Sequence, residues 1–344
     1  MSSPPIAVLA VDGGNSKVDV ALVARDGSLL ATASGPTISH QQVGVEAGMA
    51  RLRDLVHSAA ERAGLDTRVL PIAEVGLFCL AGADSRQDVH LLDAALRATG
   101  LARTTTVLND TRAGLRAGSD RGWGVIVICG SGVNCSGVAP DGREAGFAAL
   151  GPISGDWGGG GDIGRAALAA AVRARDGRGP RTSLERSVPA YFGLTRPIAL
   201  TDALNEGRID EPRLRELAPT VFAAAAEGDT VAREILDRLA DELALMAIAI
   251  IRRLHLARTD LDVVLAGGIF RADDAEFFNR LASAVRRVAP RVRLVSARTP
   301  PLLGAALLGL EAMEDGPHPA ALRRLRREFA ERGIRPERRR RPSA

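Results

Sequence analysis

Residues 6–17 read IAVLAVDGGNSK, an apolar run of strand length that ends in an aspartate, two glycines, an amide, a hydroxyl and the only lysine of the chain. The glycines have no Cβ atoms, so backbone N–H groups can approach a phosphate, and the amide and hydroxyl add side-chain donors. We therefore predict a strand that leads into a phosphate-binding loop. The predicted phosphate contacts are Gly13, Gly14, Asn15, Ser16 and Lys17.

Asp12 directly precedes these glycines, and its hard carboxylate is a predicted magnesium ligand. The sequence D-G-G is also a common hairpin signal, so an ordinary turn is the competing interpretation. Residues 18–23 and 28–34 alternate in polarity, which predicts a three-stranded meander with the loop at its first turn. A Walker A loop needs GxxxxGK[ST] at the start of a helix, and the single lysine does not stand in such a motif.

Composition places the chain among globular proteins with room for two domains: it has 344 residues, of which 46% are apolar and 25% charged. The cysteines Cys79, Cys129 and Cys135 lack metal-type CxxC spacing, so we expect reduced packing thiols. The amino-terminal residues have no basic flank or cleavage pattern, and no uncharged apolar run is long enough to span a bilayer. We therefore expect a cytoplasmic protein without membrane contact.

The formal net charge of +4 is concentrated in one place. Residues 320–344 carry ten arginines and three glutamates, hence +7, which leaves +4 − 7 = −3 for the rest of the chain. Such a run is typical of a solvated terminus, with RNA or membrane contact as the alternative. Aromatic residues make up only 3% and form no stacking motif, so we expect no nucleic-acid partner.

Asp110 follows a predicted strand at 104–108 and precedes a short helix. A carboxylate at the carboxyl end of a buried strand faces the crevice where open α/β sheets bind ligands. A helix N-cap is the equally plausible local role. His40 falls in a polar loop at 35–42, where a surface position competes with a role in a polar substrate pocket.

The pattern of the first residues recurs after residue 122. CGSGVNCSGVAPDG repeats the order of VDGGNSKVDVALVARDG: strand, glycine loop, strand, Asp-Gly turn. This is an internal duplication of one supersecondary unit, and a glycine loop from each copy suits a triphosphate.

Residues 150–164, LGPISGDWGGGGDIG, contain a superficial GxGxxG match, but no strand leads into it. We expect a flexible loop that positions Asp156 and Trp157, with Asp162 capping a helix at 163–175. A helical region at 183–256, strands at 262–266 and 292–295, and a closing apolar helix complete the pattern.

The ordered motifs DGGNSK, LND, CGSGVN, SGDWG, VVLAGGIF and PPLLGAALLG resemble the BadF/BadG/BcrA/BcrD-type ATPase family, and most closely its N-acetylglucosamine kinase-like branch within the actin, sugar kinase and Hsp70 superfamily. The resemblance covers about residues 6–315. It implies an α/β fold of two ribonuclease H-like lobes with a nucleotide cleft between them. The expected lobes are residues 1–117 with a returning helix at 302–315, and residues 118–301, followed by a basic tail at 316–344.

The resemblance also implies site residues. Asp110 looks like the catalytic base and Asp12 like the residue that acts on Mg²⁺. Beyond the first loop, the expected ATP contacts are Gly130, Ser131, Gly132, Gly267 and Gly268. The expected substrate contacts are Ser39, His40, Asn109, Asp110, Asn134, Gly151 and Asp156.

The implied activity is ATP-dependent phosphorylation of an amino sugar, N-acetylglucosamine first, at the C6 hydroxyl. Branch members have asparagine, histidine and tryptophan where this chain has Ser39, His40 and Gln41, and serine cannot replace the amide contacts to the sugar. Glucosamine and N-acetylmuramic acid therefore remain alternatives. An iron–sulfur ATPase that activates acyl-CoA dehydratases and a sugar-sensing regulator are less favoured readings, and a homodimer is possible.

Overall fold

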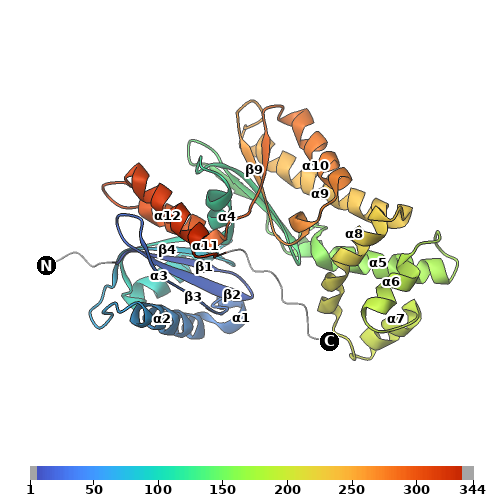
Figure 1. Cartoon of the computed structure of the whole chain (residues 1–344), viewed down its shortest axis with the longest axis horizontal. Coiled ribbons are helices and arrows are strands. Elements are labelled where there is room, and N and C mark those ends of the chain that lie inside the picture. Colours follow the sequence, from blue (N-terminus) through green and yellow to red (C-terminus); the bar gives the residue numbers. More distant parts are fainter. Residues whose placement is uncertain (1–5, 335–344) are drawn as a thin grey trace. The chain divides into compact units, whose positions relative to one another are not determined.

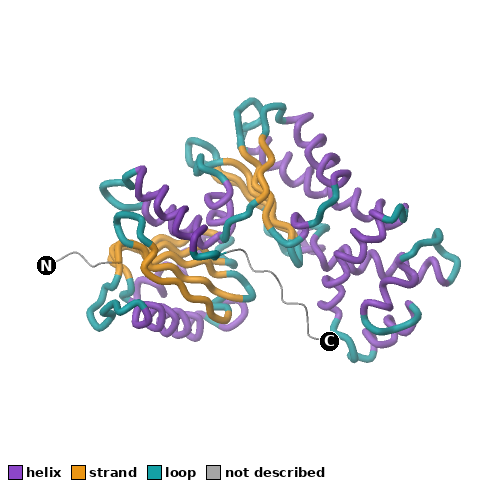
Figure 2. The backbone as a smooth tube through the Cα atoms, in the orientation of Figure 1, coloured by secondary structure: helices purple, strands orange, loops and turns teal. Residues whose placement is uncertain are grey.

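The computed structural model describes residues 6–334, which divide into two compact units. Unit 1 combines Met1–Gly122 with Ala297–Ala344, and unit 2 is Trp123–Ser296. Each unit contains a five-stranded sheet with helices packed on it (Figures 1 and 2). The expected α/β class with two lobes is confirmed.

The sheet of unit 1 has the strand order β3-β2-β1-β4-β5, in which the first three strands form an antiparallel meander and β4 and β5 run parallel to β1. The strands are β1 (Ile6–Gly13), β2 (Lys17–Val23), β3 (Leu29–Pro36), β4 (Ala73–Leu80) and β5 (Ala102–Asn109). The helices are α1 (His40–Val43), α2 (Val45–Arg62), α3 (Arg86–Thr99), α4 (Asp110–Gly118), α11 (Pro301–Glu311) and α12 (Pro319–Glu331).

Strand β1 shows why this sheet is covered on both faces. Leu9 and Val11 point into one buried cluster with α2 and α3, whereas Val8 and Ala10 point into another with α11 and α12. This alternation is the period-2 pattern of a strand, and all four residues are fully buried. In Figure 1, α2 lies on one side of the sheet and α11 and α12 on the other.

Unit 2 repeats the same topology, with the order β10-β9-β6-β7-β8. Its strands are β6 (Gly124–Cys129), β7 (Val133–Val138), β8 (Glu144–Gly146), β9 (Asp262–Ala266) and β10 (Arg293–Ser296). Its helices are η1 (Gly151–Ser154), α5 (Gly159–Arg175), α6 (Leu184–Tyr191), α7 (Pro197–Asn205), η2 (Glu211–Leu217), α8 (Ala218–Ala226), α9 (Thr230–Arg253), η3 (Ile269–Arg271) and α10 (Ala275–Val288). The predicted duplication therefore extends from the meander to the whole sheet.

The carboxy-terminal stretch corrects the expectation of a solvated tail. Residues 319–331 form α12, and its residues Leu325 and Phe329 are buried against the sheet of unit 1. Its charges find partners there as well, because Arg324 pairs with Asp26 at 2.5 Å and Arg326 with Asp120 at 2.6 Å. An apolar i, i+4 face buried along one helix outweighs the solvation of its arginines. The run RPERRRRPSA, residues 335–344, lies outside the described residues.

Candidate active site

The carboxyl ends of three parallel strands meet at one edge of the unit 1 sheet. Gly13 of β1 is paired with Leu80 of β4, and Leu80 with Asn109 of β5, so these residues form one row across the sheet. Asp12 stands one residue before this row and Asp110 one residue after it. Two strand spacings separate the outer backbones by roughly 10 Å.

The two carboxylates are more basic than ordinary aspartates. Burial raises the pKa of Asp12 to about 8, and the negative charges of Asp110 and Asp19 add to this while Lys17 opposes it. Burial also raises the pKa of Asp110 to about 6, with Asp84 as the next cause. Carboxylates kept together in partly desolvated positions are typical of functional sites and attract cations.

The first hairpin loop lies over this edge. The Gly14 N–H donates to the Lys17 carbonyl oxygen at 2.9 Å, which closes the turn, and Asn15 and Ser16 form its exposed tip. Lys17 Nζ lies 3.0 Å from Asp19 Oδ2 on β2. A Cβ atom on Gly13 would lie 2.6 Å from the tip of the Leu80 side chain, so a larger residue there would require that side chain to shift.

A second loop is fastened to the first. Thr37 Oγ1 donates to the Gly14 carbonyl oxygen at 2.8 Å and accepts from the Ser39 N–H at 3.0 Å. Ser39 is 5% exposed, and its Oγ has no hydrogen-bond partner among the described residues. The same holds for Nδ1 of His40, whose Nε2 lies 3.4 Å from Asp88 Oδ1. Unsatisfied buried polar atoms are costly in a folded protein, so this pair is suited to meet a polar ligand.

His40 and Asp110 are each the first residue of a helix, whereas the sequence predicted a loop position for His40 and allowed an N-cap role for Asp110. His40 begins α1 instead of lying in a loop, and its ring packs against Gly82, where a Cβ atom would lie 2.9 Å from it. The N-cap of α4 is Asn109, which has extended backbone angles and accepts from the Thr111 N–H at 3.0 Å. Asp110 is already the first helical residue, and, against the larger effect of burial, hydrogen bonds from the backbone N–H groups of Thr111 and of Asp110 itself lower the pKa of its carboxyl.

In unit 2 the second hairpin loop, Gly130 to Gly132, packs on the start of α5. The Gly160 N–H donates to the Gly130 carbonyl oxygen at 2.8 Å, and the Gly161 N–H donates to the Ser131 carbonyl oxygen at 3.0 Å. A Cβ atom on Gly159 would lie 2.5 Å from Gly132. The glycine run is therefore the beginning of a helix that needs close approach, and the expectation of a helix starting at residue 163 is wrong.

Two further predicted features of unit 2 are the Gly267-Gly268 pair after β9 and Asp162 in α5. Gly267 has φ +109°, and a Cβ atom there would lie 2.2 Å from the carbonyl oxygen of Cys129 at the end of β6, whereas Gly268 has open space. Asp162 lies within the first turn of α5, where Oδ2 accepts from the Gly158 N–H at 2.8 Å; it is not the N-cap.

The segment before α5, expected to be a loop that positions Asp156 and Trp157, has local hydrogen bonds of its own. Gly151 opens η1, and its carbonyl oxygen accepts from the Asp156 N–H at 3.0 Å. The Asp156 carboxylate accepts from Ser154 Oγ, and Trp157 stacks under Arg238 of α9 at 4.0 Å. Asn134 on β7 turns its Oδ1 toward the Cys135 N–H at 2.7 Å.

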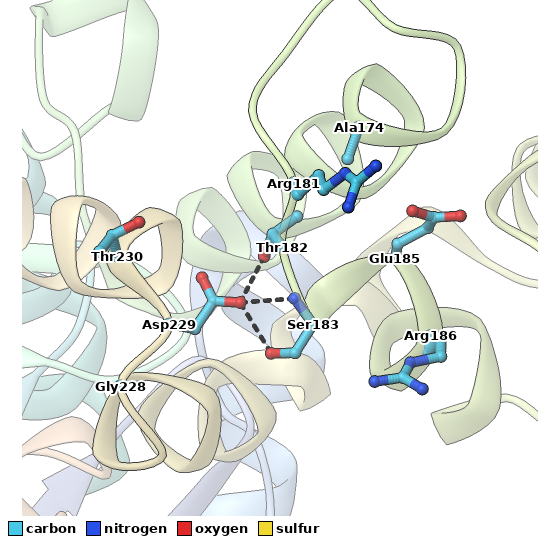
Figure 3. A pocket seen from close by; sticks show the side chains of 9 residues that line it. All are labelled: Ala174, Arg181, Thr182, Ser183, Glu185, Arg186, Gly228, Asp229 and Thr230. Atoms are coloured by element: carbon cyan, nitrogen blue, oxygen red, sulfur yellow. Dashed lines mark hydrogen bonds between the residues drawn. The ribbon is translucent and has the colours of Figure 1, made fainter.

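A separate open pocket lies in unit 2 (Figure 3), and none of the predicted site residues lines it. Asp229, the N-cap of α9, accepts there from Thr182 Oγ1, Ser183 Oγ and the Ser183 N–H at 2.5–2.7 Å. Its carboxylate is thus engaged in joining the start of α9 to residues 182–183. This pocket is a structural junction.

The three cysteines are all free and buried. Burial raises the pKa of the Cys129 thiol to about 12 and raises the pKa of Cys79 and Cys135 further still. An iron–sulfur cluster shared by two subunits needs accessible thiolates. The structure therefore disfavours the electron-activator reading.

Comparison with known proteins agrees with this geometry. The family model described as BadF/BadG/BcrA/BcrD ATPase family matches residues 9–309. The chain belongs to this family. The match ends before α12 begins.

Two curated relatives span nearly their whole length on this chain. The N-acetylmuramic acid/N-acetylglucosamine kinase of Clostridium acetobutylicum is 27% identical over 304 residues, which cover 88% of this chain and 97% of the relative. The N-acetyl-D-glucosamine kinase of Dictyostelium discoideum is 25% identical over 314 residues, covering 88% and 98%.

Among solved structures, a candidate N-acetylglucosamine kinase from Chromobacterium violaceum superposes with a TM-score of 0.66 at 24% identity. The superposition covers 89% of this chain and all of that chain. It supports the fold. In the part of this chain that the structure describes, no helix is long and apolar enough to cross a membrane.

Proposed function

We propose that this protein is an ATP-dependent kinase that phosphorylates an amino sugar, with N-acetylglucosamine as the first candidate and its C6 hydroxyl as the acceptor. The observation that carries the proposal is the pair Asp12 and Asp110 at one sheet edge, both with raised pKa values. Membership of an ATPase family and the two curated kinases support it.

Asp110 is the proposed general base. With a pKa of about 6 it is ionised at neutral pH, yet it holds a proton more strongly than an ordinary aspartate. It accepts the proton of the attacking sugar hydroxyl. Asn109 is the N-cap of α4, so Asp110 is the first helical residue and follows directly after the end of β5.

Asp12 is the proposed residue for Mg²⁺, and the surrounding charge fits a cation. The pKa of its carboxyl is raised by burial and by two neighbouring carboxylates, so a bound cation would relieve unfavourable negative charge. Among residues 6–334 no group of three or more ligating side chains is arranged around a metal site. We therefore assign the ion to one side chain of this chain plus water and phosphate oxygens, as Mg²⁺ prefers. Magnesium supplies charge neutralisation for the phosphates.

The glycine loops are the proposed phosphate contacts. In the first, the buried Gly13 and the half-buried Gly14 lead to an exposed tip at Asn15 and Ser16, and Lys17 follows. In the second, Gly130, Ser131 and Gly132 approach the start of α5, and Gly267 and Gly268 follow β9 for contacts to the nucleoside. Backbone N–H groups in such loops bind anions without a dedicated cationic side chain.

The substrate contacts are proposed from two sets of residues. Ser39 and His40 offer buried polar atoms without protein partners, and Asp156 offers a carboxylate for ring hydroxyls. Asn134 and Gly151 belong to the same proposed set. N-acetylmuramic acid is the second candidate substrate, because the Clostridium relative is named for both sugars. A small Ser39 leaves more space than an asparagine would, which favours tolerance around C2 and C3.

An ADP-release assay tests the proposal. The panel contains glucose, glucosamine, N-acetylglucosamine, N-acetylmannosamine and N-acetylmuramic acid, each with ATP and magnesium. We expect sugar-dependent ADP release that is fastest with N-acetylglucosamine. If none of the five sugars stimulates ATP turnover, the sugar kinase proposal fails.

A further inference from the structure

We propose that Asp84 is a positioning residue for Asp110, acting by fixing the side chain of Asn109 and by placing a negative charge near the base. Asp84 follows β4, and no sequence motif singled it out. The inference rests on the proposed function in one respect, since Asp110 is the base assigned there.

The geometry begins with the amide of Asn109. Its Nδ2 donates to Asp84 Oδ1 at 2.7 Å. Its Oδ1 accepts from the Thr111 N–H at 3.0 Å and from Thr111 Oγ1 at 2.6 Å. The amide is therefore held from both ends, and only one of its two possible flips satisfies these partners. Asn109 in turn starts the helix whose first residue is Asp110.

This arrangement gives Asn109 a structural role in addition to its expected substrate contact. Three hydrogen bonds within the protein engage its amide, which links Asp84 to α4. A bond between an ionised carboxylate and an amide is stronger than a neutral one. Losing Asp84 is therefore expected to loosen the start of α4.

Asp84 itself is kept close to the edge of the sheet by its neighbours in the chain. The Ala81 N–H donates to the Gly13 carbonyl oxygen at 2.7 Å, which joins the turn after β4 to the first hairpin loop. The Ala83 N–H then donates back to the Leu80 carbonyl oxygen at 3.2 Å. After Asp84, Ser85 caps α3 through a reciprocal pair with Asp88.

Neighbouring carboxylates raise the pKa values of both Asp84 and Asp110. Asp84 is the second cause, after burial, of the raised pKa of Asp110. The charges of Asp110 and Asp19 also raise the pKa of Asp12, whereas the charge of Lys17 lowers it. Burial and Asp88 raise the pKa of Asp84, whereas the bond from Asn109 and the charge of His40 lower it. Removing the Asp84 charge should therefore lower the pKa of Asp110.

Two substitutions separate the hydrogen bond from the charge. Asp84→Asn removes the charge but keeps an oxygen that can accept from Asn109, whereas Asp84→Ala removes both. Asp93→Asn on α3 is the matched control, because Asp93 bonds only Arg97 on the same helix, at 2.6 Å, and lies outside the proposed site. Thermal melting of each variant verifies folding.

The first readout is the titration of the Asp110 carboxyl carbon by NMR, without sugar or ATP. We expect the midpoint to move to lower pH in Asp84→Asn and Asp84→Ala and to stay in Asp93→Asn. The second readout is kcat and KM against pH. We expect the acid limb to move in the same direction, kcat near neutral pH to fall by up to about tenfold in Asp84→Ala and less in Asp84→Asn, and both KM values to hold.

If Asp110 titrates in Asp84→Asn at the same pH as in the wild type, the proposal that the charge of Asp84 acts on Asp110 is overturned. Wild-type kcat in Asp84→Ala overturns the positioning part. If Asp84→Ala fails to fold, Asp84→Asn, which preserves the shape, gives the decision. Absence of activity on every sugar in the wild type would sink the proposed function, while the NMR titration would still decide whether Asp84 tunes Asp110.

Discussion

The β1–β2 hairpin of unit 1 and the β6–β7 hairpin of unit 2 have the same antiparallel pairing but carry different residues near the end of their first strand. In β1 and β2 the pair before the last is Asp12 opposite Asp19, and in β6 and β7 it is Ile128 opposite Asn134. Two carboxylates directly opposite each other destabilise a sheet. Unit 1 retains that unfavourable pair, whereas unit 2 has a neutral one.

Close approaches of glycine backbone characterise the sheet edge of unit 2, whereas carboxylates characterise that of unit 1. The edge of unit 2 is built from close backbone approaches, such as Gly159 on Gly132 and Gly267 on Cys129. The edge of unit 1 gathers ionisable side chains, with Asp84 and Asp110 beside Asp12. The edge of unit 1 therefore carries carboxylates, whereas the edge of unit 2 carries closely packed backbone; we propose that the first serves proton and cation chemistry and the second backbone contacts to an anionic ligand.

The largest expected effect comes from removing the carboxylate of Asp12, whose counterpart in unit 2 is Ile128. Asp12→Ala should abolish kinase activity and weaken Mg·ATP binding, because no other side chain is assigned to the ion. Calorimetry with and without magnesium measures the affinity. Asp141→Ala, in the exposed Asp-Gly turn of the second hairpin, is the control and should bind as the wild type does. Unchanged affinity in Asp12→Ala would move the metal elsewhere.

The second prediction concerns α12, which has no counterpart in the family match. Phe329 is 1% exposed, so Phe329→Ala should lower the free energy of unfolding by about 3–5 kcal/mol. Arg323→Ala, on the exposed side of the same helix, should change it by less than about 0.5 kcal/mol. Urea denaturation measures both. Equal stability of the two variants would mean that α12 does not stabilise unit 1.

The third prediction compares adjacent glycines of unit 2. Gly267→Ala must fit a methyl group at φ +109° and 2.2 Å from a carbonyl oxygen, so it should cost at least about 1–3 kcal/mol of stability. Gly268→Ala has open space and φ −65°, and should be close to neutral. A smaller effect of Gly267→Ala than of Gly268→Ala would contradict the close approach at this edge.

The fourth prediction is a pH dependence of stability. The pKa of Asp12 is raised from 3.8 to about 8 on folding, so the folded state binds more protons than the unfolded state between these values. Stability of the magnesium-free protein should therefore fall as pH rises from 5 to 9, by an amount on the order of a few kcal/mol. Asp12→Asn mimics the protonated form and should flatten this slope. A wild-type slope that persists in the variant would assign it to other groups.

Much of the sheet architecture could be predicted from the sequence, because apolar alternation and Asp-Gly turns are local signals. The strand at 262–266 and the duplicated glycine loops are examples. Residue roles that depend on backbone angles could not be predicted from the sequence. Asn109 and Asp110 are both good capping residues, and only the extended ψ of 146° at Asn109 decides between them.

Other features depended on partners distant in the sequence. Charge counting predicts a solvated tail, but Leu325 and Phe329 bury against unit 1, and Arg324 pairs with Asp26 about three hundred residues away. The glycines at 158–161 look like a flexible loop until Gly132 is seen against them. Asp84 was missed for the same reason, since its partner Asn109 lies on another strand.

The central claim is that Asp110 serves as the base. Asp110→Asn keeps the size of the side chain and removes its basicity, so kcat should fall by about 10² to 10⁴ while affinities for Mg·ATP and sugar stay within a few-fold of the wild type. The direct measurement is the single-turnover rate of sugar phosphorylation in the purified variant, with both affinities determined by calorimetry. A single-turnover rate equal to that of the wild type would contradict the account.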